Sequence, residues 1–471
     1  MTTAERAIAF ADDLTQQVAG GARFAGLYAT SADTGMRLTG LLAAPGEVVP
    51  LDAMLPAGAS SYPALTGSVP AADWYERAVH DLTGLRPDGH PRLEPLLVAS
   101  SEAVPRRVGG HGLFSVPYGP VRGGVHESVE YVIETPGEDI PHLRIRVAAK
   151  HRGIQERFQS LSVADGVRLA ERVEGIASVA HALAYSHAVE RLAGVEVSRP
   201  AGLVRVLHAE LERVANHLDV AIGLAEAAGL VVAVSRFGWH KENVLRLAGR
   251  LCGSRFGRGV VVPGGVRSLP LLTAAEARTT LETLTARLAS DVAELMGTAT
   301  FLDRLRETGP LSVERAREWG ALGPIGRASG VDTDARLHRP YDGYLGLRLD
   351  VRARREAGDA QERLRVRWDE VTEALHLIRS AVDALDGAAA KEPIVVPTAA
   401  PDGRGIGWAE APQGEVLYAV DITDGSITRC YPRSASFHNL GLFPDVFAGD
   451  IFTDFAFIEA SFGLSIAGVA L

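Results

Sequence analysis

A few titratable side chains stand where chemistry could occur. Glu174 lies among apolar neighbours in a stretch with helical periodicity, and an unpaired carboxylate is costly to bury in such a setting. Arg172 and Arg152 are its candidate partners. A structural ion pair and a carboxylate active in proton transfer are both consistent with this pattern. His126 stands in a predicted loop, where it is either an ordinary loop histidine or a redox or proton-transfer group.

The chain contains two cysteines, Cys252 and Cys430. Two thiols can form at most one disulfide, and they cannot supply all the ligands of an iron–sulfur cluster. The simpler interpretation is that both are small buried hydrophobic residues.

Composition narrows the possible functions. A chain of 471 residues with a formal net charge of -10 is long enough for two domains, and its acidity argues against nucleic acid as the main partner. No apolar run approaches the length of a membrane span, and the N-terminus lacks the apolar core of a signal peptide. We therefore expect a cytoplasmic protein that does not itself cross a membrane.

Two consecutive stretches, residues 162–194 and 198–229, are predicted to form a helical hairpin. Each repeats apolar residues at spacings of three and four, which places one apolar stripe on a helix face. Ser162 and Gly194 supply start and stop signals for the first helix, and Pro200 suits the first turn of the second. Because only a few residues join them, the two helices should pack antiparallel.

Other elements follow from the same periodicities. Alternating residues between 129 and 147 predict an antiparallel pair of strands, and alternation from 416 to 422 with an Asp424-Gly425 turn predicts a late strand. Residues 1–103 show no long helical period until a helix near residues 74–82. Further helices are predicted at 236–253, 274–297, 313–320 and 357–385. A segment rich in Pro, Arg and Gly at 104–112 indicates a linker between domains 1–103 and 113–471.

The order of several sequence blocks is more specific than the periodicity. It resembles the hydrogenase-like large subunit shared by respiratory complex I and the membrane-bound, energy-converting NiFe hydrogenases, including formate hydrogenlyase. Residues 1–103 resemble the small α/β subunit of complex I, fused here to the large one as in formate-hydrogenlyase-type large subunits. The blocks that carry the resemblance of the large region are residues 119–126, 150–154, 171–175, 180–194, 205–218, 263–266, 327–332 and 436–440.

The resemblance implies an α+β fold. We expect an N-terminal small α/β domain and a large, mostly helical NiFe-hydrogenase-like domain with a central helix bundle and peripheral antiparallel β-hairpins.

In the metal-bearing members of this family, two Cys-x-x-Cys pairs hold nickel and iron, because soft thiolates match these metals. The matching positions here are Glu174 and Ala177 for the first pair, and Ser465 and Gly468 for the second. None of the four is cysteine. The acid that gates protons in the hydrogenases falls at Gln155, and an amide cannot take that role. We therefore expect neither nickel nor iron in this chain.

Complex I uses the same cavity for a quinone headgroup, and the resemblance places His126 at the position of its quinone-binding histidine. The quinone-contacting tyrosine of complex I falls at Gly175, and the carboxylate partner of the histidine falls at Ala227, beside Glu226. We predict a changed quinone-like cavity with His126 and Glu174 as catalytic residues. Its predicted lining is His126, Glu174, Glu226, Arg152 and Arg172.

The resemblance then implies the large subunit of a complex-I-like or formate-hydrogenlyase-like oxidoreductase, inactive on its own. It would receive electrons from a 4Fe-4S cluster on a small iron–sulfur subunit and pass them to a quinone. Membrane-embedded antiporter-like subunits would hold it at the cytoplasmic face of the inner or plasma membrane. The electron donor, whether NADH, formate or ferredoxin, would bind another chain. The alternative is a non-catalytic subunit whose vacated cavity only couples conformational change to a membrane partner.

Overall fold

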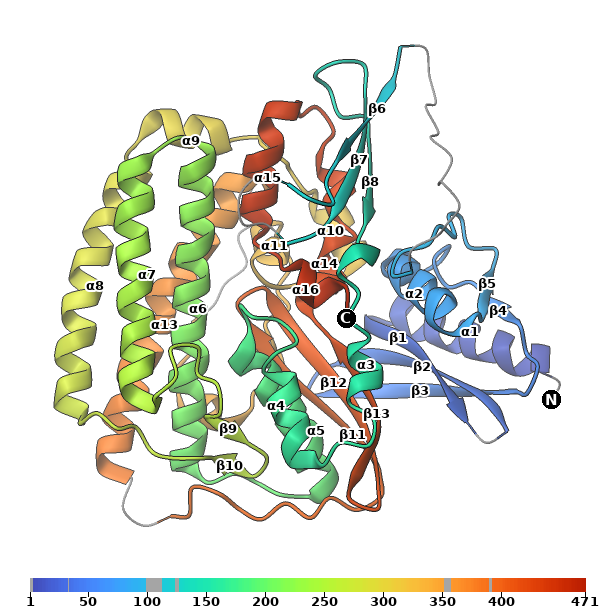
Figure 1. Ribbon diagram of the computed structural model, residues 1–471, viewed down its shortest axis with the longest axis horizontal. Helices are drawn as coiled ribbons and strands as arrows, with labels where there is room; N and C mark the ends of the chain where they lie inside the picture. Colours follow the sequence, from blue (N-terminus) through green and yellow to red (C-terminus); the bar gives the residue numbers. More distant parts are fainter. Residues whose placement is uncertain (1–2, 33, 99–111, 123–126, 351–356, 389–391) are drawn as a thin grey trace.

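The computed structural model describes residues 3–32, 34–98, 112–122, 127–350, 357–388 and 392–471. The fold is α+β: a bundle of long helices and a smaller sheet-containing N-terminal region lie on either side of a three-stranded sheet (Figure 1). Most of the predicted linker at 104–112 lies outside the described residues.

The N-terminal region is an antiparallel sheet with two helices packed on one face. Phe10 of the first helix and Tyr75 of the second share one hydrophobic core with sheet residues such as Phe24 and Leu42. The first helix was not predicted, because the sequence showed no helical period before residue 74. The face that it buries contains Ala7 and other small residues, which weaken the apolar period. The elements are α1 (Thr3–Ala19), β1 (Arg23–Ala32), β2 (Gly35–Ala44), β3 (Glu47–Pro56), β4 (Ser61–Pro63), α2 (Asp73–Thr83) and β5 (Arg86–Asp88).

A three-stranded antiparallel sheet follows. The predicted pair is present as β7 (Glu130–Thr135) and β8 (His142–Arg146), and β6 (Phe114–Tyr118) adds a third strand on the other side of β7. His126 lies outside the described residues, so its predicted role stays a prediction.

The helical hairpin differs from its prediction in one important place. The first predicted helix is two helices, α4 (Val163–Ala170) and α5 (Ser178–Ala193), separated by residues 171–177. Ser162 caps α4 and Ser198 caps α6 (Arg199–Ala227), the second predicted helix. The apolar period runs through both α4 and α5, so it does not reveal the break.

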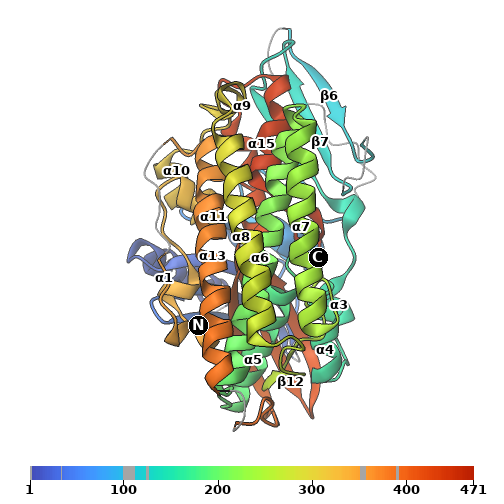
Figure 2. The same cartoon turned by 90° about the vertical axis from the view of Figure 1, so that its left-hand side faces the viewer.

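The bundle consists of four long helices that run side by side (Figure 2). Leu211 of α6, Val244, Leu284 and Leu364 come from these four helices and belong to one core. The other three helices are α7 (Val231–Cys252), α8 (Ala274–Met296) and α13 (Ala360–Ala388). Within the described residues, no helix combines the length and apolar character needed to span a membrane.

The central sheet is formed by β11 (Gly403–Ala411), β12 (Gly414–Thr423) and β13 (Ser426–Arg433). The predicted late strand and its turn are therefore confirmed. Helix α5 packs against β11 so closely that a Cβ at Gly405 or Gly407 would overlap the α5 backbone. The opposite side contacts the N-terminal sheet, where Tyr431 stacks on Tyr28 with ring centroids 4.3 Å apart.

Short elements connect these layers and return the C-terminal segment to the centre of the molecule, beside β12 and α3 (Figure 1). They are α3 (Ile154–Arg157), β9 (Val261–Val262), β10 (Gly265–Val266), α9 (Ala299–Leu305), α10 (Val313–Trp319), α11 (Gly323–Ala328), α12 (Ala335–His338), α14 (Ala435–Leu440), α15 (Phe455–Phe462) and α16 (Ile466–Val469).

Candidate functional site

Glu174 lies in the turn between α4 and α5, and 1% of its surface is exposed. Its carboxylate accepts a hydrogen bond of 2.6 Å from the Ser436 hydroxyl. Its other oxygen lies 3.1 Å from His181 Nε2, and His181 Nδ1 lies 2.8 Å from the Tyr418 hydroxyl. A neutral imidazole that donates to Glu174 and accepts from Tyr418 satisfies both contacts. We call Glu174, His181, Tyr418 and Ser436 the Glu174 cluster.

The positions predicted to have lost their metal ligands meet at this cluster. A Cβ added to Gly468 would lie 2.6 Å from the carboxyl carbon of Glu174. The Ser465 amide donates to Ser436 Oγ over 3.1 Å, so the C-terminal segment closes over the turn. Ala177, fully buried, is the residue before the first residue of α5. The structure therefore brings Glu174, Ser465 and Gly468 together.

The predicted arginine partners of Glu174 take other positions. Arg152 donates to the carbonyl oxygens of Val173 and Ala467, each over 2.6 Å, and so ties the turn to the C-terminal segment. Arg172 is largely exposed and lies 3.4 Å from Glu171. The expected ion pair of Glu174 with either arginine is therefore wrong, because the two guanidinium groups point to backbone and to solvent.

The prediction that Glu226 lies at the same cavity as Glu174 is also wrong. It is exposed and lies one residue from the C-terminal end of α6, whereas Glu212 of the same helix lies beside the turn. At 1.5 Å per residue, about 21 Å of helix separates these two positions. The Glu212 carboxylate accepts from the amides of Val179 and Ala180, at 2.7 and 3.0 Å, and so caps the N-terminus of α5.

Three further groups at the site were not singled out as site residues by the sequence reasoning. Glu127 accepts from the Ser465 hydroxyl over 2.9 Å and from the Ala467 amide over 3.2 Å. Ser436 belongs to residues 436–440, one of the blocks that carried the resemblance. Its place in that block was the signal by which the sequence could have identified it. Glu212 carried no signal in the sequence, because helical charge is most often on a solvated face.

A cavity of about 90 Å³ lies on the other side of the turn from the cluster. Burial raises the pKa of Glu212 to about 8, against the opposing effect of its two backbone donors. Burial also lowers the pKa of His208 to about 4, so that its imidazole is neutral at neutral pH. The lining residues are Gly175, Ile176, Val179, His208, Leu211, Glu212, Ala215, Asn216, Asp219, Lys241, Val244, Leu245, Ala248, Arg255, Phe256 and Gly257.

The donor atoms at the Glu174 cluster do not fit a nickel–iron centre. They are one carboxylate, one imidazole and two hydroxyl groups, with no thiolate to bridge two soft metals. Cys252 ends α7 and Cys430 lies on β13, and both thiols are buried and unpaired. Across the part of the chain that the structure describes, no three His, Cys, Asp or Glu side chains are grouped to hold a metal ion.

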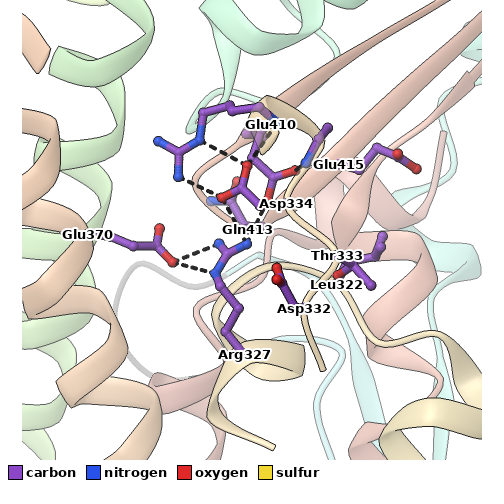
Figure 3. A network of polar contacts seen from close by, with 12 residues as sticks. Leu322, Arg327, Asp332, Thr333, Asp334, Glu370, Glu410, Gln413 and Glu415 are labelled. Atoms are coloured by element: carbon purple, nitrogen blue, oxygen red, sulfur yellow. Dashed lines mark hydrogen bonds and ion pairs between the residues drawn. The ribbon is translucent and has the colours of Figure 1, made fainter. Parts of the chain in front are cut away.

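A second polar region lies between α6, α13 and β11. Figure 3 shows the Arg327 guanidinium between Glu370 on one side and Asp334 and Glu410 on the other, with Arg327 Nε 2.8 Å from Glu370 and Nη1 3.2 Å from each of the other two. Burial by itself would raise the pKa of Asp334, but Arg336 and Arg327 outweigh it and hold that pKa well below its ordinary value. We call this region the Arg327 network; its charged members are Glu210, Arg213, Arg327, Asp334, Arg336, Glu370 and Glu410.

Comparison with known families gives two matches, one in each part of the chain. Residues 12–110 match the family of the respiratory-chain NADH dehydrogenase 30 Kd subunit, and residues 234–400 match that of the 49 Kd subunit. One polypeptide thus matches the models of both subunit families, which confirms the resemblance stated from the sequence.

Individual relatives carry the same arrangement. The chain is 27% identical over 474 residues to the fused C/D subunit of NADH-quinone oxidoreductase from Nitrosospira multiformis, covering 86% of this chain and 78% of the relative. It is 29% identical over 411 residues to formate hydrogenlyase subunit 5 of Escherichia coli, with coverages of 80% and 71%. It is also 29% identical over 365 residues to the D subunit of NADH-quinone oxidoreductase from Carboxydothermus hydrogenoformans, with coverages of 75% and 98%. An oxidoreductase subunit is the class that these relatives define.

Proposed function

We propose that this chain is the electron-delivering large subunit of a membrane-associated oxidoreductase complex and works without nickel. It receives electrons one at a time from a 4Fe-4S cluster on a small iron–sulfur subunit. Two electrons and two protons then convert a bound quinone to a quinol. The observation that carries the proposal is the Glu174 cluster, a buried, hydrogen-bonded acid and imidazole where both vacated ligand segments meet.

The cluster has the chemistry that such a step needs. Ser436, Glu174, His181 and Tyr418 form a continuous chain of hydrogen bonds through which a proton can be relayed. Among the described residues, the ion-pair partner of Glu174 is His181 and not an arginine. His126, whose position lies outside the described residues, precedes Glu127, and Glu127 bonds to the C-terminal segment that covers the cluster. This sequence adjacency supports His126 as the quinone contact.

The names of the relatives support the proposal that this chain has partner subunits. They are named as subunits of NADH-quinone oxidoreductase and formate hydrogenlyase, so a complex with further chains is the natural setting. Antiporter-like membrane subunits would anchor the complex, and this chain would sit peripherally on the cytoplasmic face of the membrane.

A second candidate function is a non-catalytic coupling subunit. It is favoured by Arg152, which donates to the carbonyl oxygens of Val173 and Ala467 and so holds the turn and the C-terminal segment together. In that case the cluster is a structural core that transmits conformational change to a membrane partner.

Glu174→Gln separates these functions, because it keeps the shape of the side chain and removes its charge. Electron transfer to decylubiquinone should fall about 100-fold in the assembled complex, with assembly and thermal stability retained. The matched control is Glu282→Gln, which removes an exposed carboxylate on α8. An unchanged rate would refute the redox role, and loss of assembly with a normal rate per assembled complex would support the coupling role. The same preparations should contain less than about 0.1 nickel per chain.

A further inference from the structure

The short helix α14 lies between the N-terminal region and the Glu174 cluster. Its second residue, Ser436, donates to the Glu174 carboxylate over 2.6 Å. The next two residues, Phe437 and His438, instead contact side chains of helix α2 in the N-terminal region. One helix of six residues therefore has the cluster on one side and the N-terminal region on another.

The contact of α14 with α2 at Phe437 is a packing of aromatic rings. The centroids of the Phe437 and Tyr75 rings lie 4.9 Å apart, at an interplanar angle of 75°. The Trp74 ring lies 6.0 Å from that of Phe437, at the same angle. Edge-to-face pairs at such distances are favourable beyond the area that they bury. All three side chains are buried, so this packing fixes the position of α14 against α2.

The contact at His438 is a hydrogen bond whose direction follows from the other partners of the imidazole. His438 Nε2 lies 3.0 Å from the carbonyl oxygens of Trp319 and Gly320. Carbonyl oxygens only accept, so Nε2 carries a proton. Burial lowers the pKa of His438 well below its ordinary value, so the ring holds no second proton. Nδ1 therefore accepts a hydrogen bond of 2.8 Å from the Tyr75 hydroxyl.

The Tyr75 hydroxyl keeps its proton for this bond, because burial raises the pKa of Tyr75 to about 12. The backbone of His438 is held as well, since its carbonyl oxygen accepts from Trp319 Nε1 over 2.7 Å. Removal of the Tyr75 hydroxyl would leave Nδ1 of a fully buried imidazole without this donor. A buried polar atom without a partner is costly, so the residue and its helix should shift to relieve it.

Three hydrogen bonds at the cluster depend on where α14 lies. Ser436 Oγ donates to Glu174 and accepts from the Ser465 amide over 3.1 Å. Ser434, the N-cap residue of α14, donates to the carbonyl oxygen of Gly468. Because Ser434 and Ser436 belong to one helical turn, a shift of α14 would change all three contacts together.

We propose that Tyr75 is a positioning residue: through His438 it holds α14 so that the Ser436 hydroxyl meets the Glu174 carboxylate. The four members of the Glu174 cluster all lie outside the N-terminal region, so this region acts on the site indirectly. The proposal rests on the proposed function in one respect, because this geometry affects a rate only if the reaction occurs at the cluster.

Amide hydrogen exchange in the purified full chain tests the positioning without any activity. Tyr75→Phe keeps the ring and removes the hydroxyl. The amides of Phe437 and Ser465, which donate to the hydroxyl groups of the α14 cap and of α14 itself, should then exchange about 10-fold faster, while the amides of α7 keep their wild-type rates. The matched control is Tyr62→Phe, which removes a buried hydroxyl on β4 of the same region and should leave these rates unchanged. Unchanged exchange at both amides in Tyr75→Phe, or faster exchange throughout the chain, would overturn the proposal.

Kinetics of the assembled complex test whether Tyr75 acts through Ser436. Tyr75→Phe should lower kcat for decylubiquinone reduction about 5-fold, and Ser436→Ala should lower it about 10-fold. The double variant should be no slower than Ser436→Ala alone, because the first change acts only through the second residue. Multiplied effects would refute the proposal, as would a normal rate in Tyr75→Phe when Glu174→Gln is slow. If Glu174→Gln and Ser436→Ala are both without effect while the exchange result holds, the proposed function fails and the positioning of α14 by Tyr75 survives.

Discussion

Helix α6 separates two buried polar regions that differ in how their charge is balanced. Glu210, Arg213 and His217 face the Arg327 network, whereas His208 and Glu212 face the cavity. At 100° per residue, Glu210 and Glu212 point about 160° apart. One helix thus carries a polar stripe on each side.

The Arg327 network pairs its buried carboxylates with arginines, although its four carboxylates outnumber its three arginines. Each of its carboxylates lies within ion-pair distance of an arginine, and the arginines hold the pKa values of Asp334 and Glu370 well below their ordinary values despite burial. On the other side of α6, Glu212 at the cavity accepts hydrogen bonds from backbone amides, and Glu174 in the nearby turn accepts them from a hydroxyl and an imidazole. Neither has an ion-pair arginine among the described residues. Nearby arginines therefore keep Asp334 and Glu370 ionised, whereas burial raises the pKa of Glu410 within the network and of Glu212 beside the cavity. We therefore expect the Arg327 network to stabilise the fold, and under the proposed function we expect the Glu174 cluster to take part in the reaction.

The largest effect on stability should come from breaking the Arg327 network. Arg327→Met leaves Glu370, Asp334 and Glu410 without their shared cation, and the free energy of unfolding should fall by about 3–5 kcal/mol. Chemical denaturation followed by tryptophan fluorescence measures this. Arg379→Met, which removes an exposed partner of Glu282, is the control and should change stability little. A loss no larger than that of the control would mean that the network is not structural.

The raised pKa of Glu212 should make the free energy of unfolding depend on pH. The folded-state pKa of Glu212 is about 8, above the ordinary value of 4.5, so the folded state binds more protons between these values. The stability contributed by Glu212 is therefore fully present at low pH and is lost as pH rises through this window, by roughly 1 kcal/mol per pH unit. Glu212→Gln should lack this decline, and its advantage over wild type should grow up to about pH 8. Parallel curves for the two proteins would contradict the assignment.

The smallest effect should come from the contact between Gly468 and Glu174, two of the positions where the related metal-bearing proteins have cysteine. Gly468→Ala would place a Cβ 2.6 Å from the Glu174 carboxyl carbon, and the resulting overpacking should cost about 1–2 kcal/mol. In a Glu174→Ala background the same change should cost almost nothing, because the clashing group is gone. A double-mutant cycle from thermal or chemical unfolding measures the coupling. Additive effects would show that the two residues do not touch in solution.

Much of the architecture could be predicted from the sequence. The cap at Ser162, the long helix α6 with Pro200 in its first turn, and the β12–β13 turn at Asp424-Gly425 are local signals, because neighbouring residues alone satisfy them. The absence of cysteine at residues 174, 177, 465 and 468 was equally plain, since ligand chemistry depends on residue type. The order of the sequence blocks also predicted which families the chain resembles.

Tertiary structure decided how the site is assembled. The break at residues 171–177 interrupts a continuous apolar period, and Glu212, 33 residues from Val179, supplies the cap that starts α5 again. Ser436 reaches Glu174 across 262 residues, and Arg152 reaches the Ala467 carbonyl across 315. Periodicity reports only which residues are buried. Which buried partner a carboxylate meets, and whether space is left beside it, depends on how distant segments close over one another.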